Sequence, residues 1–369
     1  MALNLDIVGA CERIVAEAET MAGENYAYNL RKKNGALSFI TSPENGLGLE
    51  RGDSRLATQG GRKIAKANVF YDQRTKSCQI SDNCDQNVCD EGATPLRKEF
   101  EITIDQCVRT PVREYSNNDM AALCKDTETF MRQRGFSDIL AAHEHLDKKV
   151  LAFMDSQIGV NYEWDGTSTG AGSYKSIDIV GTSGGQAVPL PGNWEVNADY
   201  ENNQLMGIPA VIGQGNLRRF YDLQRWSCCN ATTPYGDQDF EGFARFYMDQ
   251  SANEVLGANN FIAATFGVMH MLTFNENENI AATGVNTADR FNIVVPDPVF
   301  GNAFRWNLDF YFDNCTKSWK WMYSLLYGFF NVYQEDSFAD TGEDSSPDTS
   351  PDCADDLLNM TGVFGYTAA

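Results

Sequence analysis

The sequence predicts an α+β fold, and three stretches indicate it. Residues 98–115 alternate apolar and polar side chains, as a half-buried strand does. Residues 138–158 carry apolar side chains at helical spacing. Residues 291–333 hold 14 of the 43 aromatic side chains, interrupted by Pro296, Pro298 and Gly301. So aromatic a segment buries a large area, either in a core or against other subunits.

The N-terminal third is a long, weakly hydrophobic stretch with few side chains that could pack into the core of a single globular domain. The first thirty residues have helical spacing, with Leu5, Val8 and Ile14 near one face. The chain then becomes basic and rich in glycine up to Asp72. It predicts a long extended excursion with hairpin turns at Asn34-Gly35 and Asn45-Gly46. Arms of this kind are usually stabilised by contact with another molecule.

Two helices are expected after the strand at 98–115. The first begins near Asn118-Asp119 and ends at Gly135, and Ser137 caps a second helix over 138–158. About twenty residues at a rise of about 1.5 Å make the second helix a rod of roughly 30 Å. Its apolar stripe consists of Ile139, His143, Leu146, Val150 and Phe153.

The second half of the chain predicts a mixture of short elements. Residues 159–203 are rich in Gly, Ser and Thr and indicate loops and short strands. Residues 206–221 indicate a buried strand, a glycine turn and a helix starting at Asn216. We expect a helix over 239–256, a buried strand or helix over 258–274, and several strands in the aromatic segment, with a helix near Trp319 to Phe330.

The charge of the chain restricts its partners. A formal charge of −22 opposes tight or sequence-specific binding to nucleic-acid phosphates. The charge is uneven, since residues 29–76 hold 10 Lys and Arg against 4 Asp and Glu, whereas residues 335–356 hold 9 acidic residues and no basic one. A basic region and an acidic one can pair across subunits, and the alternatives are a solvated loop and a disordered tail.

No targeting or membrane segment is expected. No apolar run approaches the roughly 18–20 residues that span a bilayer. The N-terminus has no basic stretch before an apolar run, and Glu12, Glu17 and Glu19 interrupt it early, so synthesis and folding in a cytosol is the expectation. The triplets Asn230-Ala-Thr, Asn314-Cys-Thr and Asn359-Met-Thr match the pattern for N-glycosylation, but without a signal peptide they are not evidence for it.

Ten cysteines do not form a recognisable framework. Cys78, Cys84, Cys89 and Cys107 are separated by five, four and seventeen residues, which misses the close pairs of structural zinc sites. A local disulfide in the acidic loop around Cys84 and Cys89 is the other reading if the protein matures in an oxidising setting. We favour buried or idle thiols.

The candidate catalytic patterns are weak, and no catalytic residue, metal or cofactor is predicted. Gly181 to Gly185 matches the G-x-S-x-G pattern around Ser183, but Pro189 and Pro191 oppose the helix that a nucleophile elbow needs. A glycine-rich turn is the simpler interpretation. His143 and His145 point about 200° apart on a helix and cannot share one metal ion. We expect His143 to be packed in the core or at an interface, and His145 to face away.

The order of these parts resembles the major capsid proteins of tailed double-stranded DNA bacteriophages, with the Hong Kong-97-like fold. Three stretches carry the resemblance: the helix from Ser137 to Ile158 as a spine helix, residues 206–221 as an axial-domain strand and helix, and residues 261–274 as the return to the peripheral domain. The resemblance implies an N-terminal arm (1–35), an extended loop region (36–95), a peripheral domain with the spine helix (96–158), an axial domain (159–275), a return to the peripheral domain (276–335) and an acidic C-terminal tail (336–369).

By this resemblance the chain is a structural protein, not an enzyme, that self-assembles into the icosahedral virion capsid, in the host bacterial cytoplasm. The expected partners are other copies in hexamers and pentamers, with portal, scaffold or decoration proteins, and the shell would enclose double-stranded DNA without sequence-specific binding and without a membrane. We expect the acidic tail to lie outside the core. The predicted inter-subunit contacts are Arg31, Lys32, Lys33, Arg51, Arg55, Arg62, Lys63 and Lys66.

Three alternatives to the capsid shell remain open. One is another self-assembling virion component, from a tail or a decoration. Another is a hydrolase that uses Ser183 or paired carboxylates. The last is a secreted disulfide-bonded binding protein.

Overall fold

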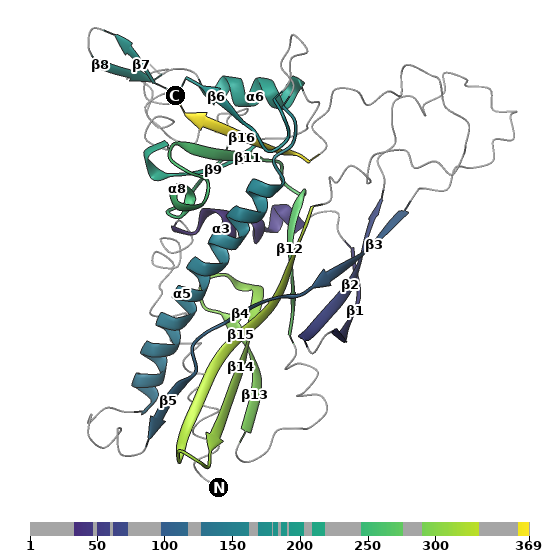
Figure 1. Ribbon diagram of the computed structural model, residues 1–369, viewed down its shortest axis with the longest axis vertical. Helices are drawn as coiled ribbons and strands as arrows, with labels where there is room; N and C mark the ends of the chain where they lie inside the picture. Colours follow the sequence, from purple (N-terminus) through teal and green to yellow (C-terminus); the bar gives the residue numbers. More distant parts are fainter. Residues whose placement is uncertain are drawn as a thin grey trace, which may run out of the picture.

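The computed structural model describes residues 33–46, 50–59, 62–72, 97–116, 127–161, 169–178, 180–183, 186–189, 192–202, 209–217, 245–275, 290–331 and 361–368. One long helix, α5 (Thr127–Ser156), runs obliquely along the molecule (Figure 1). A six-stranded sheet lies beside it, a five-stranded sheet lies at one end, and a three-stranded sheet projects to one side. The α+β class is the one that the sequence predicts.

The six-stranded sheet is built mainly from the aromatic segment. Its strands are β12 (Met269–Phe274), β15 (Ser318–Asn331), β14 (Gly301–Asp313) and β13 (Arg290–Asp297), in that order, and all neighbours are antiparallel. The short strands β4 (Gln106–Arg109) and β5 (Arg113–Ser116) also pair with β15. Trp306, Trp321 and Phe310 are almost fully buried between this sheet and its surroundings. The helix expected near Trp319 to Phe330 is wrong, because the many aromatic residues of this stretch favour the strand β15.

The five-stranded sheet has the order β10 (Arg245–Met248), β9 (Ala210–Gly213), β11 (Asn260–Ala264), β16 (Val363–Ala368) and β6 (Tyr174–Ile177). Both faces are covered. Val211, Phe261 and Phe364 pack with α6 (Gly192–Asn202), whereas Ile212 and Ile262 belong to the main core that includes α5. Because both faces are buried, β9 is apolar throughout and shows no alternation.

The two helices predicted on either side of Gly135 are one continuous helix. We expected one helix to end at Gly135 and another to start at Asp138, but α5 continues through both positions. A Cβ atom on Gly135 would lie 2.8 Å from the hydroxyl oxygen of Tyr323, so this glycine allows close packing against β15 and does not end the helix. The apolar stripe is confirmed, since Ile139, His143, Leu146 and Val150 are buried.

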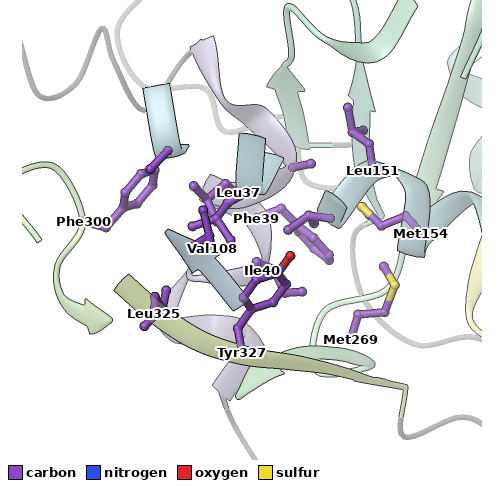
Figure 2. Packing of buried hydrophobic residues seen from close by; sticks show 14 of the residues in the cluster. Leu37, Phe39, Ile40, Val108, Leu151, Met154, Met269, Phe300, Leu325 and Tyr327 are labelled. Atoms are coloured by element: carbon purple, nitrogen blue, oxygen red, sulfur yellow. The ribbon is translucent and has the colours of Figure 1, made fainter. Parts of the chain in front are cut away.

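Residues 33–46 form short helices where we expected hairpin turns. The chain forms α3 (Gly35–Ile40) and the 3-10 turn η1 (Pro43–Gly46), so the turns predicted at Asn34-Gly35 and Asn45-Gly46 are wrong. Leu37, Phe39 and Ile40 of α3 enter the main core (Figure 2). Packing in the core stabilises a helix of six residues that could not persist alone. The extended part begins only at β1 (Glu50–Gln59).

The predictions for the short elements of the second half are confirmed only in part. The helix expected over 239–256 is replaced, in its described part, by β10 and the four-residue α8 (Ala252–Val255). The stretch 258–274 forms two strands, β11 and β12. Residues 159–203 contain short strands, as expected, among them the hairpin β7 (Val180–Ser183) and β8 (Gln186–Pro189), and also the unexpected helix α6. The helix start near Asn216 is present at 215–217, and its continuation lies outside the described residues.

The C-terminal prediction is wrong for the last residues. Residues 363–368 form β16, the strand between β11 and β6 in the five-stranded sheet. Val363, Phe364 and Tyr366 are fully buried there. The acidic composition of residues 335–356 does not extend to this apolar end, so the chain beyond 336 is not uniformly a tail. The acidic stretch itself and the predicted helix in the first thirty residues lie outside the described residues.

Candidate assembly surface

The three-stranded sheet is the part of the molecule that projects from the body (Figure 1). It consists of β1, β2 (Arg62–Asp72) and β3 (Arg97–Ile104), all antiparallel, with β2 in the centre. Its base is fixed: Ala65, Ala67 and Ile104 form a small apolar cluster with Phe274 and Leu326 of the six-stranded sheet. One end of the sheet is therefore part of the folded body.

The structure brings five of the eight predicted contact residues onto one hairpin. Arg51 and Arg55 lie on β1, and Arg62, Lys63 and Lys66 lie on β2. Between Glu50 and Asp72 the hairpin has five basic and three acidic residues, so it carries a net positive charge in a chain of charge −22.

The other three predicted contact residues are not on this hairpin. Lys33 precedes α3 and is exposed, and its carbonyl oxygen accepts a hydrogen bond from the backbone nitrogen of Gln250 (3.1 Å). Arg31 and Lys32 lie outside the described residues.

The register of the hairpin places like charges next to each other. Arg55 on β1 is the direct cross-strand partner of Lys66 on β2. Two cations at such positions repel each other and destabilise an isolated hairpin. Lys66 has one internal partner, an ion pair with Glu101 on β3, and both side chains are about half exposed (43% and 56%). An exposed pair of this kind adds little to stability.

The body, in contrast, contains buried polar groups that the sequence did not identify. The carboxylate of Asp297 accepts hydrogen bonds from the backbone nitrogens of Val299 and Phe300 (2.8 and 2.7 Å) and from Trp306 Nε1 (2.7 Å). His143 Nε2 lies 2.5 Å from Asp297 Oδ2, and neither side chain is exposed. Burial opposes ionisation of Asp297, but the pKa of its carboxyl is lowered because attraction to His143 and these hydrogen bonds together outweigh it.

The expectation for the two histidines is confirmed. His143 is packed in the core and connects α5 to the turn between β13 and β14, and His145 is exposed.

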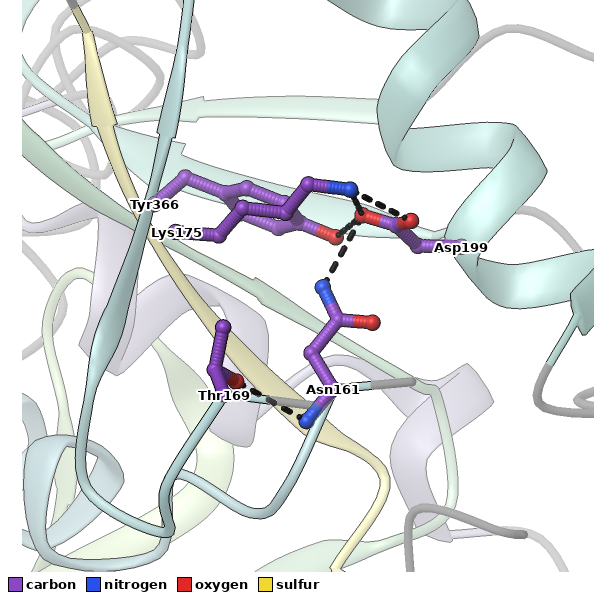
Figure 3. A network of polar contacts seen from close by, with 5 residues as sticks. All are labelled: Asn161, Thr169, Lys175, Asp199 and Tyr366. Carbon is purple, nitrogen blue, oxygen red and sulfur yellow. Dashed lines mark hydrogen bonds and ion pairs between the residues drawn. The ribbon is translucent and has the colours of Figure 1, made fainter. Parts of the chain in front are cut away.

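A second buried network fixes the C-terminal strand. Asp199 on α6 accepts hydrogen bonds from Asn161 Nδ2, Lys175 Nζ and the Tyr366 hydroxyl, each at 2.9 Å (Figure 3). Asp199 and Asn161 are nearly fully buried. The network joins α6, β6, β16 and the chain after α5, so it holds β16 in the five-stranded sheet. No spacing in the sequence relates these four residues.

The described residues offer no support for the catalytic and metal alternatives. Ser183 ends β7, which pairs antiparallel with β8, so the next described element is a strand and not the helix that a nucleophile elbow needs. Within the described ranges, no three His, Cys, Asp or Glu side chains lie close enough together to hold a metal ion. Cys107 and Cys315 are exposed thiols, and Cys78, Cys84 and Cys89 lie outside those ranges. No helix among the described elements is long and apolar enough to cross a membrane.

Comparisons with known proteins return matches at the level of structure. No family model matches the chain, and no curated protein matches it. Among solved structures, the chain is similar to the cyanophage A-1(L) capsid asymmetric unit, with 8% identity over 91% of this chain and 93% of that one, and a TM-score of 0.46. It is also similar to a structure from Mycobacterium phage Adephagia (12% identity, 91% and 90% coverage, TM-score 0.40) and to the mature capsid of bacteriophage PhiM1 (8%, 87% and 82%, 0.39).

The TM-scores of these matches lie below 0.5, so neither a role nor a residue is carried across from them. The roles of residues therefore rest on the geometry of this chain alone.

Proposed function

We propose that the chain is a shell-forming structural protein, the major capsid protein of a tailed double-stranded DNA bacteriophage. The observation that carries the proposal is the division of the molecule into a densely packed body and a basic sheet that projects from it (Figure 1). A closed shell requires each copy to bury surface against several neighbours, and a projecting sheet supplies that surface without enlarging the globule.

In this proposal the parts of the body correspond to those of the capsid fold. The six-stranded sheet with α5 is the peripheral domain, the five-stranded sheet with α6 is the axial domain, and β1–β3 form the extended loop. β12 then belongs to the peripheral domain, and residues 361–368 return to the axial domain. In this proposal the boundary expected near 275 moves to the start of β12. The end of the chain, expected to be a tail from 336 onward, contributes β16 to the axial domain.

In this proposal, charge pairing between copies makes the contacts of the shell specific. The basic hairpin of one copy binds an acidic surface of the next, which orients the copies during assembly. The proposed contacts on the hairpin are Arg51, Arg55, Arg62 and Lys63. Lys66 is proposed to interact both with Glu101 of its own chain and with the neighbouring copy. Lys33 is proposed as a separate contact at the start of α3, together with Arg31 and Lys32 before it. The acidic balance of the whole chain suits a wall that encloses DNA without adhering to it.

Negative-stain microscopy of the purified full chain, alone and with the proteins encoded beside it, tests the proposal. Closed icosahedral shells are the expected product. Tubes, rings, or attachment only to a preformed shell would favour a tail or decoration component instead. Labelling by a serine-reactive probe that Ser183→Ala abolishes would favour a hydrolase.

A further inference from the structure

Two buried aspartates hold the first turn of α3 against the body. Asp147 on α5 and Asp249, which follows β10, are both fully inaccessible to solvent. Asp147 Oδ1 accepts a hydrogen bond from the backbone nitrogen of Leu37, and Asp249 Oδ2 accepts one from that of Ala36, each at 2.9 Å. The first turn of α3 thus has two of its free backbone N–H groups bound by carboxyl groups from two distant parts of the chain.

The backbone of α3 also approaches the body very closely at this point. A Cβ atom on Gly35 would lie 2.5 Å from the carbonyl oxygen of Met248. Only glycine can be accommodated at that separation without a shift of one of the backbones. The position of α3 relative to the two carboxyl groups is therefore narrowly determined.

Two carboxylates cannot both be ionised in so dry a site. Burial, and then the charge of Asp249, raise the pKa of Asp147 to about 9, and burial raises the pKa of Asp249 as well. Asp249 accepts a second backbone hydrogen bond, from Ser251 (2.8 Å), which favours its charged form. Asp147 accepts only the bond from Leu37 among the described hydrogen bonds, so Asp147 holds the proton that the pair shares.

Other titratable groups lie on the elements that pack against α3. Glu144 on α5 raises the pKa of Asp147 further, and Lys148 is bound to Glu254, which raises its pKa. Burial lowers the pKa of His270 on β12 to about 4. Arg245 on β10 stays charged. α3 itself has no titratable side chain.

A neutral attachment lies at the other end of the segment. Asn45 Oδ1 accepts a hydrogen bond from the Gly267 nitrogen (2.8 Å), and its Nδ2 donates to the carbonyl oxygens of Ile40 and Met269. Asn45 is fully buried and carries no charge at any pH. The segment 33–46 is therefore held by one attachment that depends on a proton, at Asp147 and Asp249, and by neutral ones, at Asn45 and at the Lys33 carbonyl oxygen.

We propose that Asp147 and Asp249 form a proton-operated latch on the segment that leads into the basic hairpin. With the shared proton in place, the start of α3 is docked against α5 and β10. When the proton is lost, two like charges remain buried side by side, and the start of α3 detaches while Asn45 retains its end. The hairpin that begins at Glu50 stays anchored through Ala65, Ala67 and Ile104, so alkaline conditions loosen the segment that leads into it and not the hairpin itself.

The sign of the pH dependence follows from the raised pKa. An undocked Asp147 has an ordinary pKa of about 4, so between about pH 4 and pH 9 detachment releases one proton. The ratio of detached to docked α3 therefore increases about tenfold per pH unit in this range and becomes constant above about pH 9.

Hydrogen–deuterium exchange of the purified full chain, measured between pH 6 and pH 9, tests the latch. The protection factors of peptides covering residues 33–40, corrected for the intrinsic rate, should decrease with pH, while those of peptides from β15 should not. Asp147→Asn should abolish the decrease, because its amide oxygen still accepts from Leu37 and its amide nitrogen can donate to Asp249. Asp249→Asn should lower protection at every pH, because both of its oxygens accept backbone N–H groups.

Two results would overturn the latch. One is a protection factor of residues 33–40 that does not vary with pH in the unaltered chain, and the other is an unchanged pH dependence in Asp147→Asn. The measurement does not require shells, so its failure is distinguishable from failure of the proposed function.

Discussion

The body around α5 and the three-stranded sheet differ in where their polar groups find partners. In the body, Asp297 and Asp199 are each bonded to several groups of the same chain, and those bonds are buried. In the sheet, the one described ion pair is exposed, and two cations, Arg55 and Lys66, are neighbours in the register. The polar groups of the body are therefore paired within a buried interior, whereas the described ion pair of the sheet is exposed to solvent.

The comparison predicts the largest loss of stability where a buried partner is removed. Asp297→Ala should lower the free energy of unfolding by about 3–5 kcal/mol, because His143, Trp306 and two backbone N–H groups lose their shared acceptor in a dry site. Denaturant titration measures this. Asp313→Ala is a matched control: the carboxylate of Asp313 also accepts from the backbone nitrogen two residues on and from a lysine, but near the surface, and its removal should cost much less. Equal losses at the two sites would remove the distinction between body and surface.

Acid should destabilise the body through the same residue. The pKa of Asp297 is lowered in the folded protein, so its contribution is complete above the unfolded pKa of about 4 and is lost as the pH falls through the folded value. Asp297→Asn should therefore flatten the acid side of a plot of unfolding free energy against pH. If the unfolding free energy of Asp297→Asn decreases as steeply at low pH as that of the unaltered protein, other carboxyl groups are responsible for the sensitivity to acid. The latch at Asp147 has the opposite sign and acts on the alkaline side.

A smaller effect is expected at Gly135. Alanine normally stabilises a helix interior by about 1 kcal/mol relative to glycine. Here the added methyl group meets the Tyr323 hydroxyl oxygen, and Tyr323 is itself buried, so Gly135→Ala should destabilise by about 1–3 kcal/mol. Tyr323→Phe in the same chain removes that contact and should reverse the sign. Additive effects of the two substitutions would contradict this packing.

The smallest effect is expected in the sheet. Lys66→Ala removes an exposed ion pair with Glu101 and also a like-charge neighbour of Arg55, so the free energy of unfolding should change by less than about 0.5 kcal/mol. Thermal denaturation of the unassembled chain gives the value. A loss comparable to that of Asp297→Ala would place Lys66 in the stabilising framework of the body.

Sequence patterns predicted the elements that have a regular period and missed those that depend on distant contacts. The apolar stripe of α5 and the strands β13 and β14 of the aromatic segment follow from local spacing, although β15 was expected to be partly helical. Helix α3 and the buried strand β16 do not, because each is stabilised by partners more than a hundred residues away, such as Asp147 and Asp249 for α3 and β11 for β16. Gly135 was misinterpreted for the same reason, since Tyr323 is what it accommodates.

The candidate surface was predicted in part. Local charge identified the basic region, and the strand register then placed five of its residues on one hairpin. The buried carboxylates were missed, although Asp147 lies four residues after His143 on the buried face of the helix, where a charged side chain requires a partner. That position was the one available signal.

Charge reversal on the hairpin tests the central claim most directly. In one variant Arg51, Arg55, Arg62 and Lys63 are replaced by glutamate, and in a matched control the arginines become lysine and Lys63 becomes arginine. Both chains should unfold at the temperature of the unaltered chain, because the substituted positions lie on the projecting hairpin and not in the buried networks of the body. Electron microscopy should show shells for the control and only unassembled, folded chains for the reversed variant. Normal shells from the reversed variant would contradict the account.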